Sequence, residues 1–258
     1  MRNSKCRVFG LCCAAMTMAN CATTPQMPDV ASALEPVPAT GFINKVVQSG
    51  AEVRRYVVYV PREYDPAVAW PLIVFLHGLG ERGDDGLLQT QVGLPAAIRR
   101  WPDRFPCLVL MPQCPESTYW DGAIESIEAA LAKTLSEYSV DTTRITLTGL
   151  SMGGFATWIY GARAADTFAA LMPICGGGNV ESAAVLAETP IWAFHGADDT
   201  VVPVEQSRAM VEAVRGAGGD PRYTEYPDTG HNAWDKAYAD AKAVKWLLNQ
   251  TKRPRAGD

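Results

Sequence analysis

The sequence predicts an α/β fold, with a mostly parallel central sheet of about eight strands and helices on both faces. Two observations predict it. From residue 71 onward, short apolar runs alternate with stretches of helical periodicity, as they do when crossover helices join buried parallel strands. Before them, residues 42–48 and 54–60 alternate apolar and polar side chains around Ser49 and Gly50, which is typical of a hairpin at a sheet edge.

Five further apolar runs are predicted as buried strands, at residues 72–77, 108–112, 145–150, 169–175 and 191–195, and one more strand is predicted at residues 222–226. Between them, apolar residues recur at helical spacing, for instance at Ile124, Ile127 and Leu131, and these stripes are predicted to be core. Only residues 176–190 separate the fourth of these runs from the fifth. The sequence therefore predicts a fold without a large cap domain at that position.

The first residues have the pattern of an export signal. Three basic residues precede an apolar run over residues 8–19, which is too short to span a membrane as a stable helix. We expect residues 1–21 to be a signal peptide and the protein to be exported, to a periplasmic, extracellular or lipid-anchored location in a bacterial envelope. The four residues ending at Cys21 are similar to a lipoprotein box, apart from the asparagine before the cysteine. Lipid attachment to a membrane through Cys21 and ordinary cleavage nearby are therefore both open.

The rest of the chain divides into three parts. Residues 22–41 carry four prolines and little periodicity, so we predict a disordered spacer there. Residues 42–250 hold the predicted strands and helices and form one domain, and residues 251–258 are a solvated tail.

Charge and cysteine content exclude several classes of protein. The chain has 23 basic and 28 acidic residues, and loss of the three basic residues in the leader would leave 20 against 28. So acidic a domain, without a basic cluster, is not expected to bind nucleic acid. Four of the seven cysteines lie in the leader, and the remaining Cys107, Cys114 and Cys175 lack the number and spacing of a disulfide framework or a zinc site.

The most informative stretch is residues 145–154, a β-branched strand followed by a Gly-x-Ser-x-Gly turn and the start of a helix. This is the pattern of a nucleophile elbow, in which a serine stands on a strained turn between strand and helix. Gly149 and Gly153 give the backbone room to pack closely, and the helix after Ser151 aims its N–H groups at a developing oxyanion. The motif alone arises by chance in roughly one of every ten or twenty sequences of this length, so its partners must be sought elsewhere.

The chain has only three histidines to serve as the base. Around such an elbow the triad follows in the order serine, acid, histidine. His77 and His195 precede or overlap the positions that an acid could occupy, which leaves His231, on a loop between the last predicted strand and helix. We expect His77 to brace its loop by hydrogen bonds.

The acid should follow the penultimate strand, where Asp198 and Asp199 are neighbours. Both carboxylates cannot point at one imidazole. One would hold His231 in the required tautomer, and the other would tie down the turn or cap a helix beginning near Val204. Spacing alone does not decide between them.

An oxyanion hole requires two backbone N–H donors. Met152 supplies one, because it directly follows the nucleophile. The other is expected in the glycine-rich loop of residues 77–83, where Gly78 and Gly80 let the backbone turn its amides inward. This arrangement favours Leu79 as the second donor.

Four segments together resemble the α/β-hydrolase superfamily, and more narrowly its small esterases of the phospholipase/carboxylesterase and polyhydroxybutyrate-depolymerase-like groups and related predicted peptidases. They are residues 75–83, 140–154, 195–203 and 230–234, in that order. The resemblance covers residues 42–250 and implies an α/β-hydrolase catalytic domain. It also implies that Asp199 is the acid, three residues after the glycine of the third segment, and that Leu79 is the oxyanion donor.

We therefore predict a serine hydrolase of carboxylic esters that acts through an acyl-enzyme, with Ser151 as nucleophile, His231 as base and Asp199 as its acid. No metal or cofactor is expected. Without a cap, the cleft would suit short acyl groups or the ester end of a bulky carbohydrate or phenolic substrate. Trp120 and Trp234 are candidates for aromatic contact with a sugar or phenolic ring, with ordinary packing as the alternative.

Two other functions remain open. One is a serine peptidase of the prolyl-peptidase-like type, although such relatives usually carry an added gating domain. The other is a hydrolase fold that is kept as a non-catalytic binding module.

Overall fold

The computed structural model describes residues 38–252. The predicted leader, the lipid-attachment site at Cys21, most of the predicted spacer and nearly all of the predicted tail lie outside the described residues. None of the helices that are described is long and apolar enough to cross a membrane.

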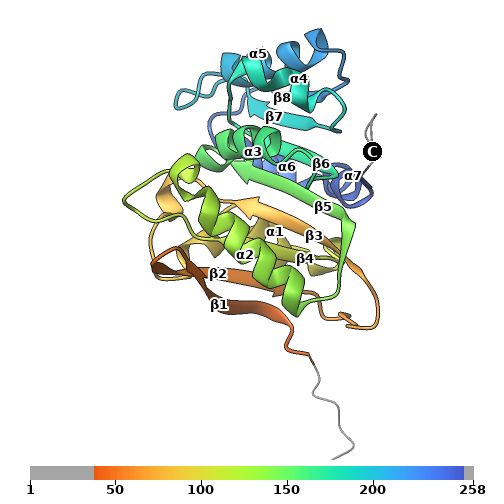
Figure 1. The fold of residues 1–258 in the computed structure, drawn as a ribbon. Helices are drawn as coiled ribbons and strands as arrows, with labels where there is room; N and C mark the ends of the chain where they lie inside the picture. Colours follow the sequence, from red (N-terminus) through yellow and green to blue (C-terminus); the bar gives the residue numbers. More distant parts are fainter. Residues whose placement is uncertain (1–37, 253–258) are drawn as a thin grey trace, which may run out of the picture. The chain divides into compact units, whose positions relative to one another are not determined.

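The described residues form one eight-stranded sheet in the order β1-β2-β4-β3-β5-β6-β7-β8 (Figure 1). Its strands are β1 (Gly41–Ser49), β2 (Glu52–Val60), β3 (Trp70–Leu76), β4 (Leu108–Pro112), β5 (Val140–Leu150), β6 (Ala170–Ile174), β7 (Trp192–Gly196) and β8 (Arg222–Tyr226). β1 and β2 form an antiparallel hairpin, β2 pairs antiparallel with β4, and the remaining neighbours are parallel. The predicted fold class, including the edge hairpin, is confirmed.

Helices cover both faces of this sheet. They are α1 (Leu94–Arg100), α2 (Ile124–Glu137), α3 (Met152–Arg163), α4 (Ala183–Leu186), α5 (Glu205–Gly216), α6 (Ala233–Ala239) and α7 (Ala241–Leu248). Alternate residues of a strand face opposite sides of its sheet, so Leu72 and Val74 of β3 join the core beneath α2 to α5. Ile73 and Phe75 join a second core beneath α1, α6 and α7. In Figure 1, α2 and α3 cross in front of the sheet.

β5 begins at Val140, earlier than the apolar run beginning at residue 145 predicts. Val140 pairs with Trp70 of β3, and a register shift separates this pair from the regular ladder. The segment from Asp141 to Arg144 is polar and at most half-buried. Because this segment is not buried, the apolar pattern gave no sign of it.

The connection between β6 and β7 is short, as predicted. It holds one turn of 3₁₀-helix (Val180–Ser182) and α4, and no cap domain. Because the strands from β3 to β8 are parallel, their carboxyl ends meet at one edge of the sheet, and loops from several strands converge there. We call this the carboxyl edge and the opposite one the amino edge.

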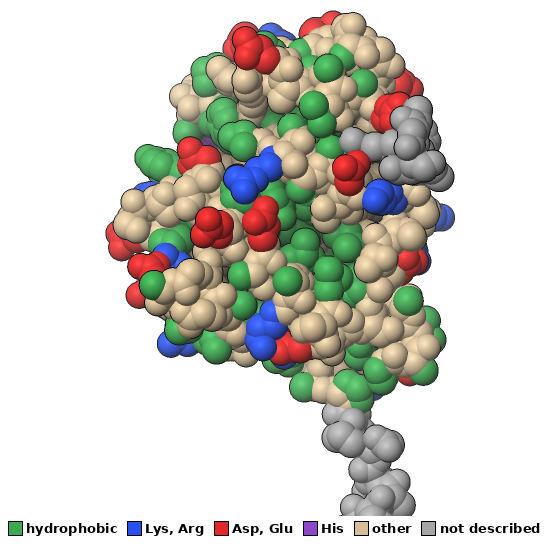
Figure 2. Space-filling view, in the orientation of Figure 1, with side chains coloured by type: hydrophobic (Ala, Val, Ile, Leu, Met, Phe, Trp, Pro, Cys, Tyr) green, Lys and Arg blue, Asp and Glu red, His purple; other side chains and the backbone are tan. Residues whose placement is uncertain are grey.

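Charged side chains are mixed on the face seen in Figure 2. Lys and Arg side chains stand among Asp and Glu rather than in a basic patch. This distribution agrees with the acidic composition.

Candidate active site

Ser151 stands on a strained turn at the carboxyl edge. β5 ends at Leu150, α3 begins at Met152, and Ser151 between them has φ 53° and ψ −118°. A non-glycine residue with positive φ costs free energy that the surrounding structure must offset. The elbow's glycines provide the room: a Cβ on Gly149 would overlap the Gly153 carbonyl, and one on Gly153 would overlap the carbonyl oxygen of Leu76.

Ser151, His231 and Asp199 form a continuous hydrogen-bonded chain. His231 Nε2 lies 2.9 Å from Ser151 Oγ, and His231 Nδ1 lies 2.7 Å from Asp199 Oδ2. An ionised carboxylate only accepts hydrogen bonds, so Nδ1 carries the proton and Nε2 presents its lone pair to the serine hydroxyl. The loop after β8 brings His231 into place, and Trp234 of α6 packs edge-on against the imidazole with ring centres 5.1 Å apart.

The structure distinguishes the two adjacent aspartates. Asp199 is buried, and its Oδ1 accepts the backbone N–H groups of Val201 and Val202 at 2.9 Å each. Burial alone would raise the pKa of Asp199, but the bonds from His231 and from these two N–H groups outweigh it and hold that pKa below its usual value. Asp199 therefore stays ionised while it orients the imidazole.

The alternative role expected of Asp198 is wrong. Its side chain is exposed, and the turn is tied down by Asp199 itself. No side chain caps α5, because Val204 occupies the capping position. One carboxylate thus performs both tasks that the sequence divided between two.

Both expected oxyanion segments flank Ser151. Met152 is the first residue of α3, and Leu79 lies in the loop that follows β3. A Cβ placed on Gly78 would lie 3.6 Å from Ser151 Cβ, which shows how closely this loop approaches the nucleophile. The backbone N–H groups of Leu79 and Met152 therefore belong to the two segments that border the serine.

His77 braces the loop that carries Leu79, as predicted. Its Nε2 accepts the Cys114 N–H at 2.9 Å, so the proton sits on Nδ1, which donates to Gly78 O at 2.7 Å. The side chain is 1% exposed, and burial lowers the pKa of His77 to about 4. His77 thus stays neutral and structural near pH 7.

Trp120 belongs to the core and offers no open surface to a substrate. It is 2% exposed, its indole N–H donates to His77 O at 3.0 Å, and its ring centre lies 4.8 Å from that of His77. The packing alternative holds here because the indole supports the His77 loop from behind. The exposed aromatic residue is its neighbour Tyr119, with the Arg82 guanidinium 5.2 Å from its ring centre.

A second group of buried side chains lies behind Asp199. Cys175, His195 and Asp199 bring their donor atoms within 4.8 Å of one another. They fit a metal ion poorly, because both Asp199 oxygens already accept N–H groups. The thiol donates to His231 O at 3.2 Å, and burial raises its pKa to about 12, far from the thiolate that a metal requires.

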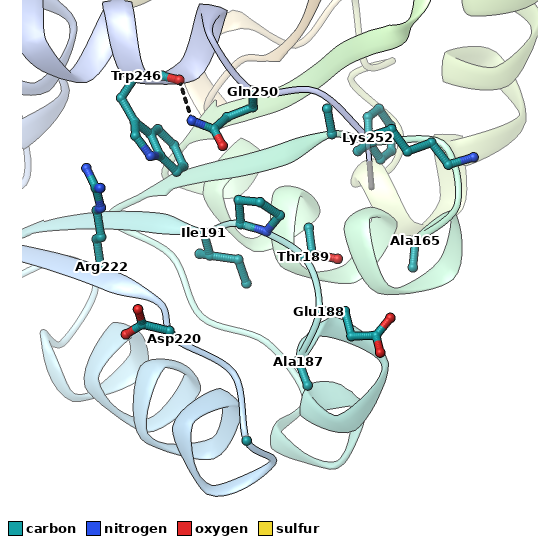
Figure 3. A pocket seen from close by; sticks show the side chains of 14 residues that line it. Ala165, Ala187, Glu188, Thr189, Ile191, Asp220, Arg222, Trp246, Gln250 and Lys252 are labelled. Carbon is teal, nitrogen blue, oxygen red and sulfur yellow. Dashed lines mark hydrogen bonds between the residues drawn. The ribbon is translucent and has the colours of Figure 1, made fainter. Parts of the chain in front are cut away.

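A large hollow lies elsewhere in the structure. A cavity of about 810 Å³ opens at the amino edge, where β7 and β8 begin and α7 ends (Figure 3). Arg222, Trp246 and Gln250 are among its lining residues. None of its lining residues belongs to the hydrogen-bonded chain of Ser151, His231 and Asp199. Cavity volume alone would therefore not identify the candidate active site.

Comparison with known protein families identifies the family to which the chain belongs. The model of the dienelactone hydrolase family matches residues 110–252, which is more than half of the chain. The chain belongs to this family. Its match spans Ser151, Asp199 and His231, and the family is part of the α/β-hydrolase superfamily that the sequence motifs resemble. The loop that carries Leu79 lies outside the matched residues.

Similar proteins of this superfamily include a putative carboxymethylenebutenolidase of Methylorubrum extorquens, 30% identical over 42% of this chain and 40% of that protein. A probable feruloyl esterase C of Aspergillus niger is 26% identical over 75% of this chain and 74% of its own length. A thermostable esterase of known structure superposes with a TM-score of 0.77 at 36% identity, covering 82% of this chain and 63% of that one. The chain thus spans less than half of the butenolidase and under two thirds of the thermostable esterase.

Sequence reasoning missed the residues that surround Asp199 in this dienelactone hydrolase family member. His195 and Cys175 were assigned no part in the site, and Ser207 of α5 was not considered. The signal for His195 was present, since it opens the segment that contains Asp199 and only four positions separate the two. Nothing in the sequence marks Cys175 or Ser207, which reach the site through strand order and helix packing.

Proposed function

We propose that the protein is a serine esterase, which hydrolyses carboxylic esters through an acyl-enzyme on Ser151. The observation that carries the proposal is the unbroken hydrogen-bonded chain from Asp199 Oδ2 through His231 to Ser151 Oγ, with links of 2.7 and 2.9 Å. Such a chain activates a hydroxyl that is otherwise a weak nucleophile. A fold retained only for binding has no use for a strained elbow that ends in such a chain.

In the proposed mechanism, Ser151 Oγ attacks the ester carbonyl carbon while its proton passes to His231 Nε2. The negative charge moves to the carbonyl oxygen, where the N–H groups of Leu79 and Met152 stabilise it. His231 then gives its proton to the departing alkoxide, and the C–O bond breaks to leave an acyl-Ser151. A water molecule repeats these steps and releases the acid, while Asp199 stabilises the imidazolium each time it forms.

The surroundings of Ser151 support short acyl, phenolic or carbohydrate esters. No cap covers the carboxyl edge within the described residues, and the side chains of Leu79, Tyr119 and Val201 on the adjoining loops are 47%, 57% and 66% exposed. They supply apolar and aromatic contact without enclosing a long chain. The names of the feruloyl esterase C and the thermostable esterase support an ester substrate over a peptide.

The test combines covalent labelling with a substrate panel. A fluorophosphonate probe should label Ser151, and Ser151→Ala should lose the label and about 10⁴-fold or more of kcat on p-nitrophenyl acetate. Turnover that survives in the folded Ser151→Ala protein would exclude Ser151 as nucleophile. A wild-type protein that neither labels nor turns over any substrate would favour the binding-module alternative.

The panel itself decides the substrate class. Acetyl, butyryl, octanoyl, feruloyl and acetylated-sugar esters should be compared with a peptide anilide on the same protein. We expect short-chain or feruloyl esters to show the highest kcat/KM and the octanoyl ester a lower one. Faster cleavage of the anilide than of the esters would favour the peptidase alternative.

We also propose export, directed by residues 1–21, followed either by lipid attachment at Cys21 or by ordinary cleavage nearby. The support is the basic start, the apolar run and the lipoprotein-like residues before the cysteine. Cell fractionation and labelling with a fatty-acid analogue would check this. Equal labelling of Cys21→Ser would exclude that attachment site, and a cytoplasmic protein would exclude export.

A further inference from the structure

His195 is a buried histidine beside the proposed triad, to which the mechanism gives no role. It lies on β7, and its side chain is 0% exposed. Its Nε2 is 3.2 Å from Asp199 Oδ2, the same oxygen that accepts the proton of His231 Nδ1 at 2.7 Å. One carboxylate oxygen therefore faces two imidazoles.

The partners of His195 fix its tautomer. Nε2 also lies 3.0 Å from Val202 O, so both groups that it faces are acceptors and Nε2 must carry a proton. Nδ1 lies 2.7 Å from Ser207 Oγ, which in turn lies 2.7 Å from Gly176 O. In a neutral imidazole, Nδ1 accepts the Ser207 hydroxyl proton and competes for it with Gly176 O.

Burial lowers the pKa of His195, more than Val202 O and Asp199 raise it. The ring therefore enters the site as a neutral donor through Nε2–H, and not as a fixed positive charge. A neutral donor can weaken the field of a carboxylate without neutralising it.

The other titratable groups around His195 act differently. Cys175, at the end of β6, is a protonated thiol that donates to His231 O. Glu225 pairs in register with His195 on β8, but Arg208 of α5 holds it with two bonds of 2.6 and 2.9 Å. Among the described residues, the side-chain N–H groups that face Asp199 Oδ2 are those of His195 and His231.

We propose that His195 is a positioning residue, whose Nε2–H holds Asp199 Oδ2 and limits the negative charge presented to His231, and so sets the proton affinity of the base. The inference rests on the proposed function, because it concerns the triad that function uses. Each hydrogen bond that a carboxylate accepts spreads its charge. Without His195, Asp199 holds the His231 imidazolium more tightly, and a larger share of His231 is protonated and unable to act as base near neutral pH.

A matched pair of variants separates this role from simple packing. His195→Gln keeps an N–H group at the place of Nε2, whereas His195→Leu removes it and fills similar space. We expect the acid limb of the kcat/KM profile to move up by about 0.5 to 1 pH unit in His195→Leu, with rates that approach wild type at high pH. In His195→Gln the limb should stay near its wild-type position.

The positioning role and a packing role predict different pH dependences for the loss of kcat/KM. A residue that only packs would lower kcat/KM by the same factor at every pH, with the acid limb unmoved in His195→Leu, and that result would overturn the proposal. An equal shift in both variants would overturn it as well, because the N–H group would then be irrelevant.

A readout that does not need turnover makes the test independent of the proposed function. The chain has only three histidines, so the ring nitrogens of His231 can be followed by NMR in ¹⁵N-histidine-labelled protein. The His231 titration should move up in His195→Leu and not in His195→Gln, even against a Ser151→Ala background. If Ser151→Ala stays active while His231 shifts as stated, the proposed function fails and the inference on His195 stands.

Ser207→Ala serves as the second variant in case His195→Leu does not fold. It leaves His195 in place but removes the hydroxyl that lies 2.7 Å from Nδ1, which weakens the donor at Nε2 because hydrogen bonds in a chain strengthen one another. The His231 titration should move in the same direction by a smaller amount. If His195→Leu does not fold and the His231 titration does not move in Ser207→Ala, the proposal is overturned.

Discussion

The carboxyl edge and the amino edge of the sheet differ in the way that matters for chemistry. The amino edge has a hollow of about 810 Å³, with Glu188, Asp220, Arg222 and Lys252 among its lining residues. Figure 3 shows these charged groups spread around the hollow, and the Arg222 guanidinium lies over the rings of Trp192 and Trp246. None of them forms a chain of the kind that a general base requires.

At the carboxyl edge, polar groups converge and the backbone is strained. All three described non-glycine residues with positive φ, Ser151, Cys175 and Asp228, lie there, as do all three histidines of the chain. Strain and buried polar networks persist only where surrounding structure enforces them. The comparison teaches that aligned donors and acceptors identify the site in this fold, and that cavity volume does not.

The sharpest test of this comparison replaces one aspartate with asparagine at each edge of the sheet. Asp199→Asn should lower kcat about 10³- to 10⁴-fold, because an amide no longer favours the tautomer with its proton on Nδ1. Asp220→Asn, at the amino-edge cavity, should leave kcat within about twofold of wild type. Initial rates on p-nitrophenyl acetate measure both.

Asp198→Asn is the neighbouring control. Its side chain is exposed, so it should keep nearly the wild-type kcat. A loss in Asp198→Asn as large as that in Asp199→Asn would show that the assignment of the acid is wrong. A large loss in Asp220→Asn would show that the amino edge takes part in the chemistry.

Most of the fold was predictable because it depends on local patterns. Five apolar runs match β3 to β7, since strands buried on both faces are apolar over most of their length. The sixth predicted strand matches β8, a polar and at most half-buried strand at the end of the sheet. The polar start of β5 was not predictable from burial, as its ladder partner lies far away along the chain. Of the site, Ser151 and His231 followed from motif order, whereas the choice of Asp199 over Asp198 needed the resemblance, because adjacent residues share every local signal.

The contacts beyond the proposed triad needed three dimensions. Cys175 and Ser207 come from β6 and α5 and meet at Asp199 and His195 only through the strand order. Trp120 shows the same limit of sequence reasoning. Its position in the sequence suggested a contact surface for the substrate, but the residue is buried against His77. Residue type and spacing thus define the participants, and packing decides which of them reach the site.

A second test compares glycines at the two edges. Gly153→Ala places a methyl group on the carbonyl oxygen of Leu76, so we expect a loss of unfolding free energy of about 3 kcal/mol or more, or failure to fold. Gly216, at the amino-edge end of α5, has nothing within 4 Å of an added Cβ, and Gly216→Ala should be neutral or stabilise by up to about 1 kcal/mol. Urea unfolding of both variants measures the difference, and an equal effect would mean that the elbow is not sterically demanding.

The smallest expected effect concerns the response of stability to acid, to which the buried His77 should contribute. Burial lowers the pKa of His77 from 6.5 to about 4 in the folded state. Between these values the unfolded chain binds a proton that the folded protein refuses, so stability is complete above pH 6.5 and falls as the pH drops toward 4. At about 1.4 kcal/mol per pH unit, the His77 contribution to this fall is about 2 to 3 kcal/mol between pH 7.5 and 4.5.

His77→Gln isolates this contribution. The variant loses stability at every pH because Cys114 N–H and Gly78 O lose their partner, but its decline between pH 7.5 and 4.5 should be shallower than that of wild type. Unfolding free energies at several pH values give the two slopes. Parallel slopes would mean that His77 takes up its proton as readily in the folded protein as in the unfolded chain, and that the loop bearing Leu79 is open enough to admit water.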